Sequence, residues 1–358
     1  MTRFIIRRLI SSVPVLIGIV LLVFVLARVI PGDPCTATYG EKATPEICAA
    51  FEQRYGLDKP IYEQFVIYAG ALVQGDLGSS IRFGRPVADL LLERLPVTAE
   101  LTLAAMLFAT VVGVSLGLLS ATRRNSPVDV GTMIVANLGV STPVFVLGLF
   151  LAFTFAVILA DTPFTLPPSG RLSPGVSVIP LAESWGLLAL DGAPRAVLDF
   201  ISNIYLFNTL VTGQWSAFVD AVRHMILPAI AVGTIPLAII ARMTRSSLLE
   251  VLGLDYVRTA RAKGLRERSV VLRHGMRNAL LPVVTVIGLS LGAFLSGAIL
   301  TETIFNLTGM GKTLFEAITG RDYIVIQGVT IVVAVAYLVV NLMVDVSYAF
   351  LDPRIRLT

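Results

Sequence analysis

Long apolar stretches separated by polar segments dominate this chain of 358 residues. A helix needs about 20 apolar residues to cross roughly 30 Å of hydrocarbon, because it rises about 1.5 Å per residue and satisfies its own backbone hydrogen bonds. We therefore expect an all-α, polytopic membrane protein. Six stretches are long enough, and they lie near residues 9–30, 98–121, 132–159, 226–248, 283–303 and 324–350.

The first apolar stretch follows three arginines, a pattern that also begins secretory signals. It is longer than the apolar region of a signal, and residues 29–34 (VIPGDP) are a poor match to the small-residue pattern of a cleavage site. We therefore expect residues 1–30 to form a retained transmembrane helix.

Composition agrees with a location in a bilayer. Apolar residues make up 55% of the chain and charged residues 15%, and the mean hydropathy is +0.82. Soluble domains carry about 25% charged residues, so this class is excluded. The net charge of +4 does not indicate a nucleic-acid partner. The basic residues gather in the segments between alternate apolar stretches, and membrane topology explains that placement.

Lys and Arg residues concentrate on one side of the expected membrane. With six spans, that side contains the N-terminus, the 121–131 segment, the loop from Arg242 to Arg277 and the C-terminal tail. The opposite side contains residues 31–97 and 160–225, which are rich in Asp and Glu. Because basic loops stay in the cytoplasm, we expect both termini to be cytoplasmic.

The segments between the spans differ in their expected structure. Residues 45–55, capped by Thr44, and residues 60–74 have the pattern of amphipathic helices, so the first external segment should fold as a cap. The expected parts are the N-terminal helix at 1–30, the external cap at 31–97, a five-helix core at 98–350 with an external insertion at 160–225 and a cytoplasmic loop at 249–281, and a cytoplasmic tail at 351–358.

Both cysteines, Cys35 and Cys48, fall in the expected external cap. An external pair in an oxidising compartment favours a disulfide, because a metal site needs more ligands than two thiols without a nearby histidine. Two unpaired thiols are the alternative. The sequence does not show whether the Cα atoms approach within the roughly 7 Å that a disulfide requires.

Residues 255–282 are the stretch most informative about function, because they form a basic segment between two apolar stretches. At helical spacing, Leu254, Val257 and Ala260 share one face and basic residues surround them. Gly264 permits a backbone turn that other residues disfavour. We expect two short helices that meet at this glycine and project into the cytoplasm. A solvated basic loop is the alternative interpretation.

This loop resembles the cytoplasmic coupling loop of ABC-importer permeases, in which a short helix, a glycine, a second short helix and a proline recur. Gly264 and Pro282 occupy the places of the glycine and the proline, and residues 267–281 occupy that of the second helix. The general motif begins with Glu-Ala-Ala, whereas the aligned residues here are 258–260 (RTA). This variation is familiar in the peptide branch of the family.

Further short motifs lie along nearly the whole chain, namely YGLDKP at 55–60, GDLG at 75–78, RMTR at 242–245, TARAKGL at 259–265, RNALLP at 277–282, TE at 301–302 and DPRIR at 352–356. In combination they resemble the first permease subunit of dipeptide and oligopeptide ABC importers, and the dipeptide type most closely. The resemblance implies a type I importer permease fold with six transmembrane helices, in the cytoplasmic membrane of a bacterium or archaeon.

The resemblance also implies partners: a second homologous permease, two cytoplasmic ATPases and an external solute-binding protein. It implies that ATP and Mg bind in the ATPases, and that this chain has no catalytic, cofactor-binding or metal-binding residue. The loaded binding protein would dock on the cap and insertion, and the coupling loop would transmit ATPase closure to the spans. The loop residues implied to act are Asp255, Tyr256, Arg258, Thr259, Ala260, Arg261, Lys263, Gly264, Leu265 and Pro282.

Two other classes of function are weighed against the importer. An ion-coupled secondary transporter would favour inverted repeats and broken helices with polar residues near the midplane, and we identify neither in the sequence. A non-transporting membrane scaffold for a cytoplasmic assembly would also suit the basic loop.

Two further features suggest chemistry. Residues 309–313 (GMGKT) contain a GKT, but a phosphate-binding loop needs a glycine where Asn306 stands and a strand before it. This segment is also expected to face away from the cytoplasm. Asp345 is an ionisable residue inside an expected span, which raises the hypothesis of a proton relay. We favour a position near the cytoplasmic end, where Asp345 pairs with a basic residue or caps a neighbouring helix.

Overall fold

The computed structural model describes residues 2–29 and 33–351, and the described chain is helical. Five helical segments in this part are long and apolar enough to cross a membrane. They are α1 (Thr2–Val29), α5 (Val87–Thr122), α11 (Trp215–Leu252), α14 (Met276–Gly297) with the helical turns before it, and α17 (Tyr323–Leu351). The C-terminal tail expected at 351–358 lies, after residue 351, outside the described residues.

The sixth expected span is broken. In place of one helix over 132–159, the chain forms α6 (Pro127–Ser141) and then α7 (Val144–Phe153), which a π-helical turn extends to Ile158. The two parts are bent by 104° and are long enough to span a membrane only together. Pro143 lacks a backbone N–H and forces the preceding residue away from helical geometry, so Thr142 is extended at φ −97° and ψ 127°. No broken helix was identified in the sequence, and the structure contains one here.

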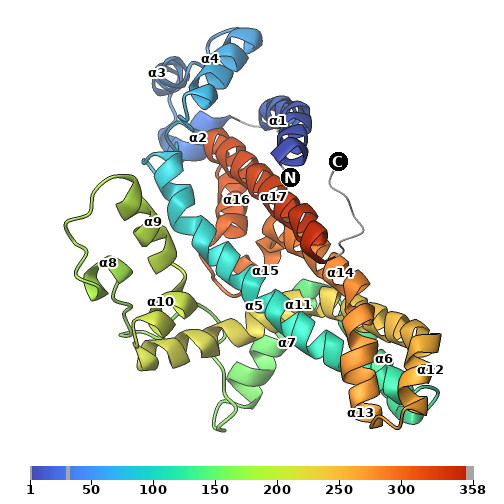
Figure 1. Ribbon diagram of the computed structural model, residues 1–358. Coiled ribbons are helices and arrows are strands. Elements are labelled where there is room, and N and C mark those ends of the chain that lie inside the picture. The colour runs from blue at the N-terminus through green and yellow to red at the C-terminus, as the bar shows by residue number, and fades with distance from the viewer. Residues whose placement is uncertain (1, 30–32, 352–358) are drawn as a thin grey trace.

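Helices α5 and α11 form the centre of the bundle (Figure 1). Both begin well before the apolar stretches expected from the sequence. Small residues allow their backbones to approach closely. A Cβ added at Gly117 of α5 would lie 2.5 Å from the carbonyl oxygen of Ala241 in α11, and one at Gly113 would lie 2.9 Å from that of Leu237. Glycine at these positions sets the helix spacing.

The cap after α1 contains α2 (Pro34–Tyr39), a short 3₁₀ turn (Gly40–Lys42), α3 (Pro45–Tyr55) and α4 (Ile61–Val73). The Thr44 hydroxyl accepts a hydrogen bond from the Ile47 N–H at 3.4 Å, so Thr44 caps α3 as expected. In the structure Cys35 and Cys48 form a disulfide with their Cα atoms 5.5 Å apart. Closing a loop of this size stabilises a fold by roughly 3 kcal/mol in the chain-entropy model.

The insertion expected at 160–225 is folded and fixed to the core. It contains α8 (Leu181–Ser184), α9 (Ala193–Ser202) and α10 (Tyr205–Val211). The buried carboxylate of Glu100 in α5 accepts hydrogen bonds from Arg171 Nη2 and from the Leu206 N–H, both at 2.6 Å. Asp220 in α11 accepts two from Ser173, its N–H and its hydroxyl, both at 2.7 Å. These buried contacts make the insertion part of the folded unit.

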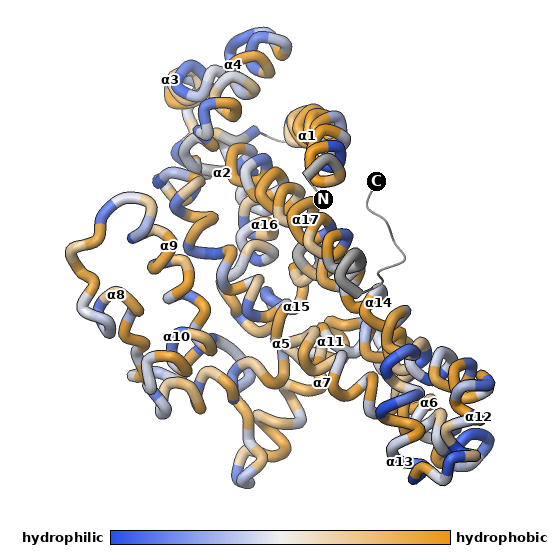
Figure 2. Tube along the Cα trace, in the orientation of Figure 1, coloured by the Kyte–Doolittle hydropathy of each residue, from blue (hydrophilic) through white to orange (hydrophobic). Residues whose placement is uncertain are grey.

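Hydropathy divides the molecule along its length (Figure 2). Polar residues gather around α12 (Asp255–Ala262) and α13 (Glu267–Ser269) at one end of α5 and around α3 in the cap, with apolar helices between them; α4 of the cap is itself apolar. Asp345 lies near one end of α17, and its Oδ2 accepts a hydrogen bond from Arg8 Nε of α1 at 2.7 Å. Arg8 Nη2 forms an ion pair with the same oxygen at 2.5 Å. The expected pairing with a basic residue is therefore confirmed, although its partner comes from α1.

Candidate functional site

The basic loop forms a compact helical unit between α11 and α14. Helix α12 is followed by a turn, then by α13 and a π-helical turn (Val270–Gly275) that continues directly into α14. The second short helix expected at 267–281 therefore has no end of its own. Pro282 lies inside α14 and does not terminate a helix. Because proline has no backbone N–H, α14 lacks one of its internal hydrogen bonds at this position. That loss destabilises the helix but need not end it where neighbouring helices hold it in place.

Gly264 forms the elbow between α12 and α13. Its φ of +74° lies in the left-handed region that favours glycine, and its N–H donates to the Arg261 carbonyl at 2.9 Å. A Cβ atom at position 264 would have no atom of the described residues within 4 Å, apart from those of its neighbours in the chain. Glycine is therefore needed for backbone conformation and not for space.

The inner face of α12 packs on the rest of the loop. Val257 and Ala260 are buried with Val270 of the π-helical turn, and Leu252 of α11 packs against this cluster. The expected apolar face is therefore partly correct. Leu254, the residue just before α12, is 46% exposed and does not belong to the cluster. Ala260, which was expected to contact the ATPases, is buried and faces the protein's own interior.

The outer face of the loop is charged and exposed. Arg261 donates two hydrogen bonds to Glu267 across the elbow, at 3.1 Å from Nε and 2.7 Å from Nη2. This interaction raises the pKa of Arg261 above its ordinary value, so the guanidinium stays charged. The remaining candidates are all exposed, namely Asp255, Tyr256, Arg258, Thr259, Lys263, Gly264 and Leu265.

Tyr256 connects the outer face to the start of α14. Its hydroxyl donates to the His274 carbonyl at 3.2 Å and accepts from Asn278 Nδ2 at 2.8 Å. The structure thus brings the candidates of residues 255–265 together on one short unit. Pro282 belongs to the span that follows. An exposed, ordered face of this kind, backed by an apolar cluster, can dock a protein partner and pass a displacement to α11 and α14.

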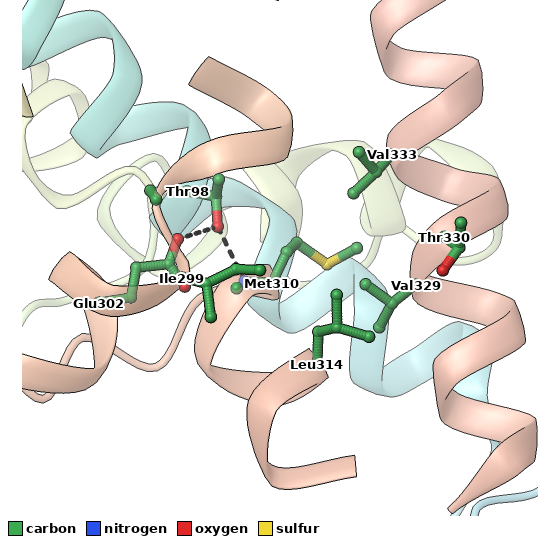
Figure 3. Close-up of a pocket in the computed structure, with 10 residues that line it drawn as sticks. Thr98, Ile299, Glu302, Met310, Leu314, Val329, Thr330 and Val333 are labelled. Carbon is green, nitrogen blue, oxygen red and sulfur yellow. Dashed lines mark hydrogen bonds between the residues drawn. The ribbon is translucent and has the colours of Figure 1, made fainter. Parts of the chain in front are cut away.

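Away from the coupling loop, the GMGKT segment at 309–313 surrounds the side chain of Glu302 (Figure 3). Glu302 of α15 (Ile299–Ile304) is fully buried, accepts from the Thr98 hydroxyl at 2.6 Å and accepts from the Lys312 N–H at 2.9 Å. The Met310 N–H donates to Thr98 Oγ1 at 2.8 Å. Thr98 and Glu302 thus satisfy the free N–H groups at the start of α16 (Met310–Thr319).

This arrangement explains the glycines without a nucleotide. A Cβ at Gly309 would lie 2.5 Å from both Glu302 Oε2 and Thr98 Oγ1. The helix N-terminus therefore holds a carboxylate where a phosphate-binding loop holds a phosphate. Sequence reasoning rejected the nucleotide site but did not find Glu302 as the anchor. The signal available was an acidic residue seven positions before a Gly-x-Gly segment.

The chain was compared with known proteins. Residues 113–357 match the family described as the binding-protein-dependent transport system inner membrane component, and residues 1–102 match the N-terminal family of such membrane components. The chain belongs to this family. It is an inner-membrane component of a binding-protein-dependent transport system, and the helices that could span a membrane agree with that assignment.

Curated relatives of this transport component match over the full length. The di/tripeptide transport system permease protein of Pseudomonas aeruginosa is 46% identical over 99% of both chains. The dipeptide transport system permease protein of Escherichia coli is 45% identical, again over 99% of both chains. The oligopeptide transport system permease protein of Bacillus subtilis is 37% identical over 99% of this chain and all of its own. The expected resemblance to peptide-transport permeases is therefore confirmed.

Proposed function

We propose that this chain is the permease subunit of an ATP-driven importer of dipeptides or short oligopeptides, and that it forms half of the translocation pore. The observation that carries the proposal is the exposed unit at 255–265, whose buried side is continuous with two spans. Full-length similarity to permeases named for di- and tripeptides supports the cargo class.

The proposal assigns a partner to each end of the molecule. Two ATPase subunits bind the cytoplasmic side and supply ATP and Mg, a second homologous permease completes the pore, and a solute-binding protein delivers peptide to the cap and insertion. Both termini and residues 249–281 are cytoplasmic, in keeping with the basic residues there. This chain itself is non-catalytic and provides the path and its coupling to ATP hydrolysis.

Affinity purification of the chain from its native membrane tests the proposal. Two ATPases and a second permease should copurify in stoichiometric amounts, and the complex in proteoliposomes should take up dipeptide only with ATP inside and the binding protein outside. Uptake by the chain alone, driven by an ion gradient without ATP, would favour an ion-coupled secondary transporter. Proteins of that class also contain broken helices like the bent span seen here. Recovery of the chain without any ATPase would contradict the proposal.

A further inference from the structure

An ion pair with a buried carboxylate joins α6 of the bent span to the end of α11 that leads into the coupling loop. Asp129 lies in the first turn of α6 and is 4% exposed. Its carboxylate accepts two hydrogen bonds from Arg245 of α11, at 2.8 Å from Nε and 2.8 Å from Nη2. It also accepts hydrogen bonds from the Ser120 hydroxyl of α5 and from the Asn125 N–H, the latter at 2.9 Å. One carboxylate thus connects three elements and the turn between two of them.

The geometry of this ion pair is directional and constrained. Two parallel bonds between a guanidinium and a carboxylate fix the relative orientation of the two side chains, which a single contact would not. Asn125 has a φ of +60°, a conformation that Asn adopts more readily than most residues, and this places its N–H toward Asp129. The turn is therefore shaped around the carboxylate.

Arg245 belongs to the same packed unit as the coupling loop. The end of α11 that follows it buries Leu248 with Val271 of the π-helical turn and with Met276 of α14, and Leu252 packs against this cluster. Leu252 also packs against the cluster that holds Val257 of α12. Displacement of α12 would therefore move the end of α11, and Arg245 with it, because closely packed side chains transmit displacement.

The other partner, α6, leads from the ion pair toward the external side. After the 104° bend, α7 packs against the region anchored by Glu302. A Cβ on Gly148 of α7 would lie 3.2 Å from the ring of Phe305, which directly follows α15. The bent span thus contacts the coupling end through Asp129 and the external anchor through Gly148.

We propose that the ion pair of Asp129 and Arg245 makes the bent span follow the ATP-driven movement of the coupling loop. Both are positioning residues, since they act through the helices that they join. This inference rests on the proposed function and adds to it a specific link between the coupling loop and a span outside the loop. Hinge-like bending at Thr142 would then convert displacement of α6 into reorientation of α7 beside Phe305.

Environment-sensitive fluorophores on either side of the ion pair test this link. One complex carries Ile134→Cys in α6, a position that is 54% exposed, and another carries Ala262→Cys at the exposed end of α12. Both native cysteines are bridged in the structure and leave the introduced thiol as the labelling site. The complete complex with ATPases, second permease and binding protein is trapped with ATP and vanadate. Both labels should respond.

Breaking the ion pair should separate the two responses. With Asp129→Asn, the label at Ala262 should respond as before, and the response at Ile134 should fall about fivefold or more. Asp129→Glu, which keeps the charge, should restore part of the Ile134 response. Ser120→Ala removes one hydrogen bond from the same carboxylate but keeps the ion pair, so it should leave both responses near those of the parent.

Three results would overturn the proposed link. They are an unchanged Ile134 response with Asp129→Asn, loss of both responses, and failure of the Asp129→Asn and Asp129→Glu complexes to assemble. The last two would mean that the pair holds the whole cytoplasmic end together and does not link two moving parts. A silent Ala262 label with an intact ion pair would instead contradict the proposed function itself.

Discussion

Replacing Val257 with aspartate should detach the coupling helix and abolish transport. Val257 has no exposed surface and packs with Ala260 and Val270 in the small cluster that holds α12 against the loop. An unpaired charge in such a site costs about 3–5 kcal/mol, more than a helix of eight residues recovers elsewhere. The spans rest on separate apolar clusters, so the protein should still insert.

The measurements are copurification of the ATPase subunits and limited proteolysis of the loop. ATPase recovery should fall at least about tenfold, a change that corresponds to 1.4 kcal/mol, and protease should cleave near α12. Val257→Ala is the matched control, because it changes the same buried position but keeps it apolar and adds no charge. Normal ATPase recovery with Val257→Asp would show that the apolar cluster does not position the contact face.

Replacing Gly264 with valine should reduce coupling while the complex still assembles. At φ +74°, a side chain with Cβ costs about 1–2 kcal/mol, and a β-branched one is a clear outlier. A cost of that size changes the ratio of correctly to incorrectly folded elbow by roughly 5–30-fold. The exposed residues of α12 would then be misplaced relative to the ATPases. Ala260, which is buried, would move only because α12 moves.

The quantity to measure is dipeptide taken up per ATP hydrolysed in proteoliposomes. Gly264→Val should lower this ratio several-fold, and Gly264→Asn should largely preserve it, since Asn tolerates the left-handed conformation. Because nothing crowds the position, the two variants differ mainly in backbone strain. Equal ratios for valine and the parent would show that the elbow geometry is incidental to coupling.

The spans and the elbow could be predicted from the sequence because each depends on local rules. Twenty apolar residues have few alternatives to a transmembrane helix, and glycine is the residue type that most readily adopts the backbone angle found at position 264. The break at Thr142 was not predicted, although a proline at 143 disfavours helical geometry at the residue before it, because the apolar pattern continues across the proline. Pro282, by contrast, lies within a helix. Whether a proline bends or ends a helix depends on what packs around it.

The polar anchors could not be predicted, because each joins residues far apart in the chain. Glu302 meets Thr98 across 204 positions, and Arg245 meets Asp129 across 116. Periodicity describes which face of a helix is apolar, but it does not say which helices become neighbours. The burial of Ala260 has the same origin, since its partner Val270 lies beyond the elbow.

The central claim is that the exposed face of α12 contacts the ATPases, and site-specific photocrosslinking tests it most directly. A benzoylphenylalanine at Arg258, whose side chain is 76% exposed, should form an adduct with an ATPase subunit in the native membrane. The same residue at Trp185, exposed on the external insertion, is the control and should form none. ATPase adducts from position 185, or their absence from position 258, would contradict the account.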